Sequence, residues 1–530
     1  MVRRITRLLA FLSCLLLPAA TLSQFPNIRV SDPDNIYPEE VVISINPADP
    51  QNLAAGANLN NYYYSMDGGY TWVESTLTSS FNVWADPCVV FDADGSLYYS
   101  HLSYPGVTPG DSYDRIVVQK SIDRGVTFDD GVGVGHNPPK DQDKSWLAVD
   151  LTDSPYRNNV YVAWTEFDVL QSTDPGDSSR ILFSRSTDHG ATWSAPVRLS
   201  DRGGDATDGD GTVEGAVPAI GPNGEVYVSW AGHELIYFDK SLDGGVTFGA
   251  DTIVATHPGG WKIDIPSIYR CNGFPVTMCD VSDSPYRGHV YILFSDQRAG
   301  LDDTDVYIIK STDGGATWSS PVGVIQEQGP HHQFFPWGTI DPATGFIYVV
   351  FYDRRFVGGD STEVFIATSE DGGTTWADFR VSDTPFLTTA SVFFGDYIGI
   401  AARRGKIHPI WTRMDAGSLS VWTAVLTNPR GIDDVPVPPH AQLLQNYPNP
   451  FNAATTIEFE LPGPMRAVLS VYDVNGAFVV TLVDRTFSEG PHQVDWTGEN
   501  AKGKDVGSGV YFYRLQAGGE TITRKMTVVK

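Results

Sequence analysis

One eight-residue pattern constrains the fold of this 530-residue chain more than any other feature. The pattern is Ser-x-Asp-x-Gly-x-Thr followed by Trp or Phe, and its six copies, 55 to 70 residues apart, begin at Ser65, Ser121, Ser186, Ser241, Ser311 and Ser369. Such a period indicates one supersecondary unit that is stacked repeatedly. The Asp can accept hydrogen bonds from the backbone N–H groups that follow it, and the Gly permits the positive φ of a tight connection. The pattern therefore predicts a hairpin turn, after which the Thr-aromatic pair begins another strand.

This pattern resembles the Asp-box, or BNR repeat, of sialidases and other Asp-box β-propellers. The resemblance covers roughly residues 25–426. In that family the motif lies on the propeller face away from the substrate. The resemblance therefore implies a structural role for the six motif carboxylates, which belong to Asp67, Asp123, Asp188, Asp243, Asp313 and Asp371.

The apolar strand patterns predict one unit more than the motif does. Seven apolar strands, for example residues 160–164, each follow another apolar strand that ends in a turn. Six units continue into an outer strand after the motif, and residues 27–32 resemble those outer strands. We therefore expect an all-β chain with a seven-bladed β-propeller over residues 25–426, closed by its N-terminal strand so that the ring has no open edge. The sialidases that the motif resembles have six-bladed propellers, so their catalytic residues cannot be assigned to this chain position by position.

The N-terminal residues and the charge of the chain indicate where it acts. Residues 1–23 are typical of a secretory signal peptide, with three arginines, an apolar run and then small residues. Without them the formal charge changes from −28 to −31, which disfavours binding to nucleic acid. No other stretch is apolar and long enough to span a membrane. We expect a secreted or surface-attached protein, most simply a monomer.

The C-terminal part predicts a separate module. Residues 427–443 are rich in Pro and read as a semi-rigid linker, and residues 444–530 contain alternating strands at short spacing, which predict a small Ig-like β-sandwich. The segments NYPNPFN, VYDVNG and SGVYFYRL, together with the basic last strand, resemble the type A sorting domain of the type IX secretion system. That resemblance implies export by the type IX machinery across an outer membrane, followed by release or surface attachment. The alternative is a generic Ig-like adhesion domain.

Three cysteines follow the predicted signal peptide. Cys271 and Cys279 are close in sequence, and in an oxidising compartment they are expected to form a disulfide. Cys88 lies in an apolar strand and is expected to be an inert buried thiol.

Candidate site residues cluster in the loops that lead into the innermost strands, which converge on one face of a propeller. Six of the seven loops carry acids at nearly equivalent places: Glu39 and Glu40, Asp86, Asp143, Glu214, Asp264 and Asp396. Crowded carboxylates raise one another's pKa or attract a cation, so the ring could hold Ca²⁺ or supply an acid/base pair for glycoside chemistry. The alternative is that each acid caps backbone N–H groups or pairs with a neighbouring blade. No cofactor is required, and Ca²⁺ is the one metal considered.

A second group of candidates lies at the ends of the second strands. Arg298, Arg355 and Arg413 occupy similar positions in three consecutive units. Sialidases clamp a sugar carboxylate with three arginines, and a guanidinium suits that task. Each arginine also has an acid two residues away, so salt bridges within a blade are the alternative. Further candidates are Tyr352 as a nucleophile and His332 and Trp337 as substrate-binding residues.

Two functions remain open from these residues. The first is a glycoside hydrolase, similar to an exo-sialidase, that acts on extracellular glycans or glycoproteins. The second is a non-catalytic propeller that binds a polysaccharide or protein partner. Because a fold does not determine a function, the resemblance alone does not choose between them.

Overall fold

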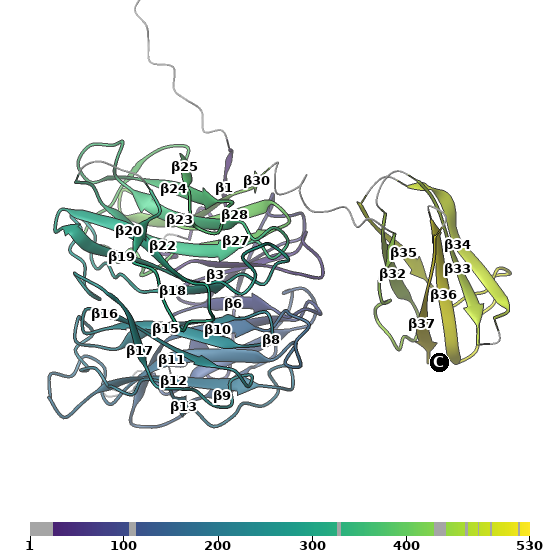
Figure 1. Cartoon of the computed structure of the whole chain (residues 1–530), viewed down its shortest axis with the longest axis horizontal. Helices are drawn as coiled ribbons and strands as arrows, with labels where there is room; N and C mark the ends of the chain where they lie inside the picture. Colours follow the sequence, from purple (N-terminus) through teal and green to yellow (C-terminus); the bar gives the residue numbers. More distant parts are fainter. Residues whose placement is uncertain are drawn as a thin grey trace, which may run out of the picture. The chain divides into compact units, whose positions relative to one another are not determined.

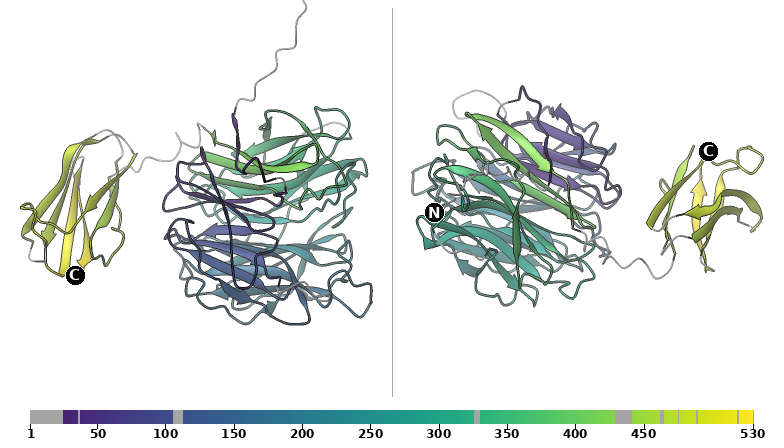
Figure 2. Two further views of the ribbon diagram at one scale, coloured as in Figure 1. Left: turned by 180° about the vertical axis from the view of Figure 1, so that it is seen from behind. Right: turned by 90° about the horizontal axis from the view of Figure 1, so that it is seen from above.

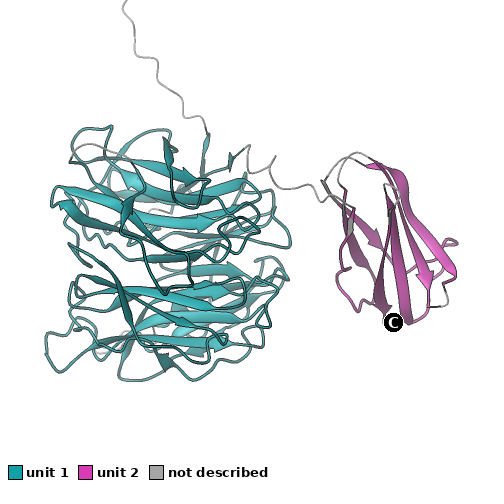
Figure 3. Ribbon diagram, viewed as in Figure 1, with its two compact units in different colours: residues 1–432 teal, residues 433–530 magenta. Residues whose placement is uncertain are grey.

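A computed structural model of the chain describes residues 25–529, except 36, 105–112, 326–329, 429–440, 462–464, 475, 488–489 and 518–519. The chain divides into two compact units, residues 1–432 and 433–530 (Figure 3). All of the regular structure in the described residues is β-strand. No helix among them is long and apolar enough to cross a membrane. The predicted signal peptide, residues 1–23, and most of the predicted linker lie outside the described residues.

The first unit contains seven antiparallel sheets (Figure 1). From the innermost strand outward they are β2 (Val42–Ile45), β3 (Leu53–Ala57), β4 (Asn61–Ser65) and β5 (Val73–Thr76); β6 (Cys88–Phe91), β7 (Leu97–Leu102), β8 (Ile116–Ser121) and β9 (Val132–Val134); β10 (Asp141–Val149), β11 (Val160–Phe167), β12 (Ser179–Ser186) and β13 (Val197–Arg198); β14 (Glu214–Ile220), β15 (Val226–Gly232), β16 (Leu235–Ser241) and β17 (Thr252–Thr256); β18 (Val276–Cys279), β19 (Val290–Gly300), β20 (Asp303–Ser311) and β21 (Val322–Gly323); β22 (Gln333–Ile340), β23 (Ile347–Asp353), β24 (Ser361–Ser369) and β25 (Ala377–Arg380); and β27 (Gly399–Arg403), β28 (Lys406–Asp415), β29 (Ser418–Ala424) and β1 (Asn27–Arg29). Two short strands, β26 (Phe386–Leu387) and β30 (Leu426–Thr427), pair with β24 and β28.

The seven innermost strands pack against one another in cyclic order, β2, β6, β10, β14, β18, β22, β27 and back to β2. The all-β propeller fold predicted from the sequence is thereby confirmed. The last sheet takes its outer strand from the N-terminal part of the chain, because β1 pairs with β29 in the register Ile28 to Thr423. This pairing ties residues about 400 apart in sequence and leaves no open sheet edge between the first and last units.

Apolar burial holds neighbouring sheets together. The second strands of several sheets, such as β11 and β15, are buried along their whole length because a sheet packs on each face. Their alternating aromatic and β-branched side chains suit such positions, as with Tyr161 and Trp230. The core is thus a series of layers between sheets, while the axis of the ring is lined by the first strands.

The repeated motif forms the same hydrogen-bonded turn in all six copies. In the copy that starts at Ser241, the serine hydroxyl donates to Asp243 at 2.7 Å and accepts from the backbone N–H of Gly245 at 2.9 Å. The backbone N–H and the hydroxyl of Thr247 both donate to the same carboxylate. The remaining copies repeat these bonds, with Thr hydroxyl to Asp distances of 2.5 to 2.7 Å. All six aspartates therefore act within their own turns.

The second unit is a two-sheet sandwich (Figure 2). One sheet contains β31 (Gln442–Leu443), β32 (Thr455–Leu461) and β35 (Gly490–Trp496), and the other contains β34 (Phe478–Phe487), β33 (Met465–Asp473), β36 (Gly509–Ala517) and β37 (Glu520–Val528). Its core is a separate cluster that includes Phe459, Leu469 and Tyr513. This unit has its own hydrophobic core, as expected of an independent domain.

The predicted disulfide is wrong, because Cys271 and Cys279 are both free thiols. Cys271 lies before β18 and packs in the core between the sixth, seventh and first sheets, whereas Cys279 ends β18 and packs against a different cluster. The two thiols therefore lie in different parts of the core and are not paired. Cys88 is buried as predicted, and burial raises the pKa of its thiol to about 12.

Candidate active site

A residue with a positive φ recurs near the start of the innermost strands, at the axis of the propeller. Just before or within the start of six innermost strands, one residue has a positive φ; these residues are Glu40, Asp86, Lys144, Gly215, Phe335 and Gly395. The register of the first strand against the second shifts there in three of these sheets, as in a β-bulge. For a residue with a side chain this conformation costs about 1 kcal/mol, and such strain concentrates at functional sites. The irregularity therefore marks this end of the ring.

The motif turns lie at the opposite end. The motif follows the third strand of a sheet, and the third strand runs parallel to the first because each neighbouring pair is antiparallel. The motif is thus at the far end of the first strand from the loop that leads into it. The structure places the axial site and the six motif carboxylates on different faces.

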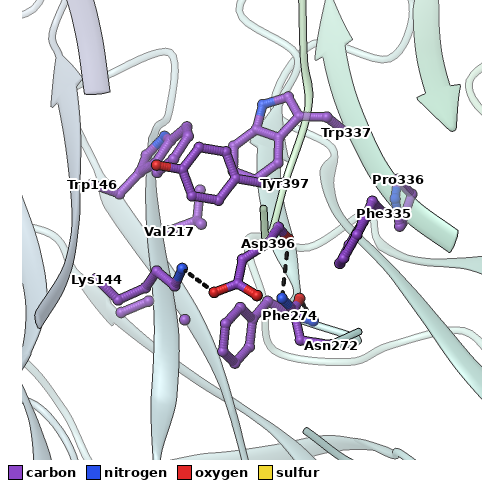
Figure 4. Close-up of a pocket in the computed structure, with 12 residues that line it drawn as sticks. Lys144, Trp146, Val217, Asn272, Phe274, Phe335, Pro336, Trp337, Asp396 and Tyr397 are labelled. Atoms are coloured by element: carbon purple, nitrogen blue, oxygen red, sulfur yellow. Dashed lines mark hydrogen bonds and ion pairs between the residues drawn. The ribbon is translucent and has the colours of Figure 1, made fainter. Parts of the chain in front are cut away.

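Lys144 is the centre of the axial site. Its Nζ lies 2.9 Å from Asp396 Oδ2, 3.4 Å from Asp86 Oδ1 and 3.7 Å from Glu40 Oε1. Its ammonium group also lies over two aromatic rings, with Nζ 5.6 Å from the ring centre of Phe274 and 5.0 Å from that of Tyr397. Figure 4 shows the side chain of Lys144 pointing toward Asp396, with the interaction between them drawn as a dashed line. One buried cation thus joins acids from three neighbouring units.

Arg270 supplies the second positive charge. Its Nε donates to Asp396 at 3.1 Å and its Nη1 donates to Asp208 at 3.0 Å. The guanidinium also lies over the rings of Trp261 and Phe393, at 5.2 and 5.1 Å from their centres. Arg270 is therefore fixed in place by ion pairs and by stacking.

These charged groups surround an open cavity of about 270 Å³. Its ionisable lining consists of Glu39, Glu40, Asp86, Asp143, Asp208, Glu214, Asp396, Lys144 and Arg270. Aromatic side chains of Trp84, Tyr113 and Phe393 complete the wall. A concave site with several ionisable groups and a few aromatic faces is the usual form of a small-molecule site.

The carboxyl groups of the cavity divide into two classes. Burial raises the pKa of Glu214 to about 8, with a further contribution from Asp208. Burial, and then the charge of Asp86, raises the pKa of Asp143 well above its usual value. Burial works against ionisation of Asp86 and Asp396 as well, but the positive charge of Lys144 lowers the pKa of both.

Hydrogen bonds link the two classes directly. The carboxyl groups of Asp143 and Glu40 both hydrogen-bond to Asp86. A protonated carboxyl that donates to a carboxylate is the arrangement expected when crowded acids cannot all ionise. Glu214 accepts a 2.6 Å hydrogen bond from the indole N–H of Trp261. The pKa shifts in the cavity are therefore in opposite directions, which favours ionised carboxylates beside protonated carboxyls.

An aromatic cluster adjoins the cavity along the axis. The ring centres of Trp146 and Trp337 are 4.2 Å apart, and that of Tyr397 is 5.3 Å from Trp146 (Figure 4). A second, small cavity of about 20 Å³ lies beside these rings and shares Lys144 and Asp396 with the larger one. Trp337 therefore packs next to the site, in contact with another tryptophan.

Four of the predicted catalytic acids meet in the cavity: Asp86, Asp143, Glu214 and Asp396. Asp264 does not join them, because its side chain is exposed and does not line either cavity. Tyr352 is not placed to act as a nucleophile. It is fully buried in the core, where its hydroxyl donates to the carbonyl of Thr412 at 2.6 Å.

The three predicted clamp arginines are not brought together. Arg298, Arg355 and Arg413 pair with Asp296, Asp353 and Asp415, at Nε–O distances of 2.9, 2.6 and 3.0 Å. They also lie over Tyr307, Phe365 and Trp422, each in the arginine's own sheet. None lines the cavities of the described structure. The alternative of salt bridges within a blade describes them correctly.

His332, another predicted substrate-binding residue, also lies away from the cavity. Its Nδ1 is 3.1 Å from the hydroxyl of Thr304, and burial lowers the pKa of its ring. It contributes to packing between the fifth and sixth sheets.

Three charged residues that line the cavity were not predicted from the sequence: Lys144, Arg270 and Asp208. Lys144 directly follows Asp143 and precedes an apolar strand, so its position beside the acid ring was a usable signal. Arg270 and Asp208 lie in longer loops with no periodic position, so nothing in the sequence placed them at the axis. Within the described residues no three His, Cys, Asp or Glu side chains are grouped as metal ligands. The Ca²⁺ hypothesis stays a prediction.

Comparison with known families identifies only the C-terminal module. Residues 449–520 match the FlgD Ig-like domain. The match covers a small part of the chain, and it agrees with the two-sheet sandwich seen in the second unit. No curated protein matches the sequence.

Solved structures resemble the chain at low identity. A protein of unknown function from Dyadobacter fermentans DSM 18053 is 13% identical, with 76% of this chain and 98% of that chain covered and a TM-score of 0.42. A Hadza microbial sialidase is 13% identical, with 72% and 75% covered and a TM-score of 0.40. An α-L-arabinofuranosidase from Fusarium graminearum is 15% identical, with 76% and 98% covered and a TM-score of 0.41. Similarities this weak say nothing about the chemistry of this chain.

Proposed function

We propose that the axial cavity binds a sugar residue of an extracellular glycan and hydrolyses its glycosidic bond. The observation that carries this proposal is the convergence, in one cavity, of carboxyls whose pKa is raised by burial and carboxyls whose pKa is lowered by Lys144. Glycoside hydrolysis needs both, one carboxyl to protonate the leaving oxygen and one carboxylate to act as base or nucleophile. Environments that push the pKa values of two acids apart assign those roles.

Glu214 is the proposed general acid. Its carboxyl faces the cavity, is held by Trp261 and has a pKa of about 8, so it carries a proton at neutral pH. Asp86 is the proposed base or nucleophile, because Lys144 keeps it ionised while Asp143 hydrogen-bonds to it. The aromatic wall, Trp84 above all, offers a flat apolar face on which a sugar ring can stack.

The charges of the cavity favour a neutral sugar. Both of its described cations are already paired, Lys144 with three acids and Arg270 with Asp396 and Asp208. An anionic sugar would therefore meet several acids and no unpaired cation among the described lining residues. We propose neutral glycosides in preference to the sialosides that the Asp-box resemblance implies.

Hydrolysis of 4-nitrophenyl glycosides by the purified protein tests the proposal. A panel should include neutral hexosides, pentosides and a sialoside. We expect turnover of a neutral glycoside, and a loss of about 100-fold or more in kcat/KM for Glu214→Gln and for Asp86→Asn. With a 2,4-dinitrophenyl leaving group, which needs no proton, Glu214→Gln should recover much of its activity while Asp86→Asn should not.

Asp264→Asn is the matched control, because Asp264 occupies the equivalent loop of the fifth unit but is exposed. It should behave as the native chain does. Absence of turnover on the whole panel would refute the hydrolase proposal. Retention on a glycan array, lost in Glu214→Gln, would then favour the non-catalytic binding function.

We propose, further, that the protein acts outside the cell. The features that support this are the signal-like residues 1–23, the strongly acidic composition and the C-terminal resemblance to type IX sorting domains. Deletion of residues 444–530 should leave the protein in the periplasm of a type IX-competent host, as measured by fractionation. Secretion of the shortened chain would contradict the role in export.

A further inference from the structure

We propose that Lys144 is a positioning residue, an internal cation that keeps Asp86 and Asp396 as carboxylates while other carboxyl groups of the cavity, Asp143 and Glu214 among them, hold protons. The consequence for catalysis rests on the proposed function. The electrostatic role itself does not, because it follows from the arrangement of the side chains.

The geometry around the ammonium group supports this role. An ammonium group has three N–H donors and no acceptor. Three carboxyl oxygens, from Asp396, Asp86 and Glu40, face Nζ at 2.9 to 3.7 Å, and the lysine side chain is only 9% exposed. The backbone N–H of Lys144 adds bonds to the same group of acids, at 3.0 Å to Asp86 and 2.8 Å to Asp143. The residue binds the cavity's acids through both its backbone and its side chain.

The two carboxylates differ in their dependence on Lys144. Asp396 also forms an ion pair with Arg270, whereas Lys144 is the only cation that pairs with Asp86 in the described structure. Other ionisable groups around Lys144 are the acids Glu40, Asp143, Asp208, Glu214 and Tyr397, together with the cation Arg270. Arg270 pairs with Asp396 and Asp208 but forms no ion pair with Asp86 in the described structure, and the acids cannot replace the positive charge of Lys144. Loss of Lys144 should therefore raise the pKa of Asp86 more than that of Asp396.

A merely structural role for Lys144 predicts something different. The lysine joins the third unit to the first, second and seventh, so its loss would weaken the ring even if its charge had no effect on protonation. That weakening would be the same at every pH. A role in setting protonation makes the loss depend on pH, because buried carboxylates without a counter-cation are costly only when ionised.

The test is the melting temperature of the full chain from pH 4.5 to 9, compared between the native protein and Lys144→Met. In the variant the folded-state pKa of Asp86 lies above its unfolded value, so the stability linked to it is present at acid pH and is lost as the pH rises. We expect the melting temperature of the variant to be close to that of the native protein near pH 4.5 and to decrease progressively relative to it toward pH 9. In the double variant Lys144→Met/Asp86→Asn, the difference in melting temperature from the native protein should be smaller at high pH and should depend much less on pH.

Lys140→Met is the control. Lys140 is close to Lys144 in the sequence but does not line the cavity, and it pairs with Glu166 and Asp168 through a side chain that is 30% exposed. It should change the melting temperature little. A native-to-variant difference for Lys144→Met that is constant across pH, or that Asp86→Asn does not reduce, would overturn the proposal. Should Lys144→Met fold only at acid pH, the proposal is supported; should neither it nor the double variant fold at any pH, the role is structural and the proposal is wrong.

Activity separates this inference from the proposed function. If a glycoside is hydrolysed, Lys144→Met should move the acid limb of the kcat/KM profile up by about 1–3 pH units, and Lys144→Arg should largely restore it. Turnover with an unmoved acid limb would overturn the role of Lys144 and leave the hydrolase standing. The melting experiment needs no substrate, so an inactive protein still tests Lys144.

Discussion

Single residues with left-handed backbone conformations build the cavity. Glu40, Asp86 and Lys144 belong to three consecutive units, and each has a φ between 48° and 57°. In the fourth and seventh units the equivalent positions are Gly215 and Gly395, which adopt this conformation without cost. Glu40, Asp86 and Lys144 thus accept the strain and bring their side chains together at the axis, and Phe335, the strained residue of the sixth unit, lines the smaller cavity. This link between strain and side-chain convergence is the strongest residue-level sign of function.

A prediction at this scale concerns Glu214. Its pKa of about 8 in the folded state exceeds its unfolded value near 4.5, so its contribution to stability is present below about pH 4.5 and is lost as the pH rises to 8. Relative to Glu214→Gln, the native protein should therefore lose stability between pH 5 and 8, by an amount on the order of a few kcal/mol. Chemical denaturation of both proteins at several pH values measures it. Parallel stability curves would contradict the raised pKa.

The repeated turn is stabilised by its own local hydrogen bonds, so it forms in each unit whatever the lengths of the connecting loops. The serine and aspartate close the turn with four local hydrogen bonds, while the connecting loops elsewhere in a unit vary in length. In one copy, bonds from Thr192 and Ser186 lower the pKa of Asp188 to about 2. The seventh sheet does not carry the sequence motif and receives β1 instead. Local chemistry stabilises six sheets and chain closure stabilises the seventh.

Removal of one turn carboxylate should cause a modest, local loss. Asp243→Ala eliminates bonds to Ser241, Thr247 and Val246, which are near the surface and worth about 1 kcal/mol each at most. We expect the melting temperature to fall by about 1–4 °C, with unchanged turnover, because the turn is on the face opposite the cavity. Asp283→Ala, at a fully exposed acid, is the control. A loss of activity without unfolding would contradict the structural role.

The closing strand should matter more than any one turn. Besides pairing with β29, Asn27 bonds through its side chain to the carbonyl of Val381 and the N–H of Asp383 in the sixth unit. A chain that begins at Ser31 should therefore lose several degrees of melting temperature and become sensitive to protease near β29. Differential scanning calorimetry and limited proteolysis measure both effects. Native stability in the shortened chain would show that ring closure does not depend on β1.

The whole molecule consists of two units with separate cores, so their unfolding should also be separate. Removal of residues 433–530 should leave the melting transition and the proposed glycosidase activity of the propeller unchanged, and should abolish one calorimetric transition. The same calorimetry on the full chain supplies the reference. A shift of more than a few degrees in the propeller transition would show that the units stabilise each other.

Local sequence rules were sufficient for most of the fold. Turn chemistry, strand periodicity and the outer-strand pattern of residues 27–32 predicted the class, the repeated sheets and the closure by β1, because each depends on neighbouring residues or on a repeated pattern. They also predicted which loops meet, and so placed Asp86, Asp143, Glu214 and Asp396 together. Two of the failed predictions, Tyr352 as a nucleophile and a disulfide between Cys271 and Cys279, depended on burial and on distances across strands.

The sequence by itself thus determined the ring and the face on which acids gather, since both follow from short-range patterns that repeat. Only the tertiary structure decided the charge of those acids. The pKa of a buried carboxyl depends on every charge within a few ångströms, and the deciding charges come from Lys144 and Arg270, which are more than 120 residues apart in the sequence. Protonation in the cavity is therefore a property of the assembled axis, which no single unit contains.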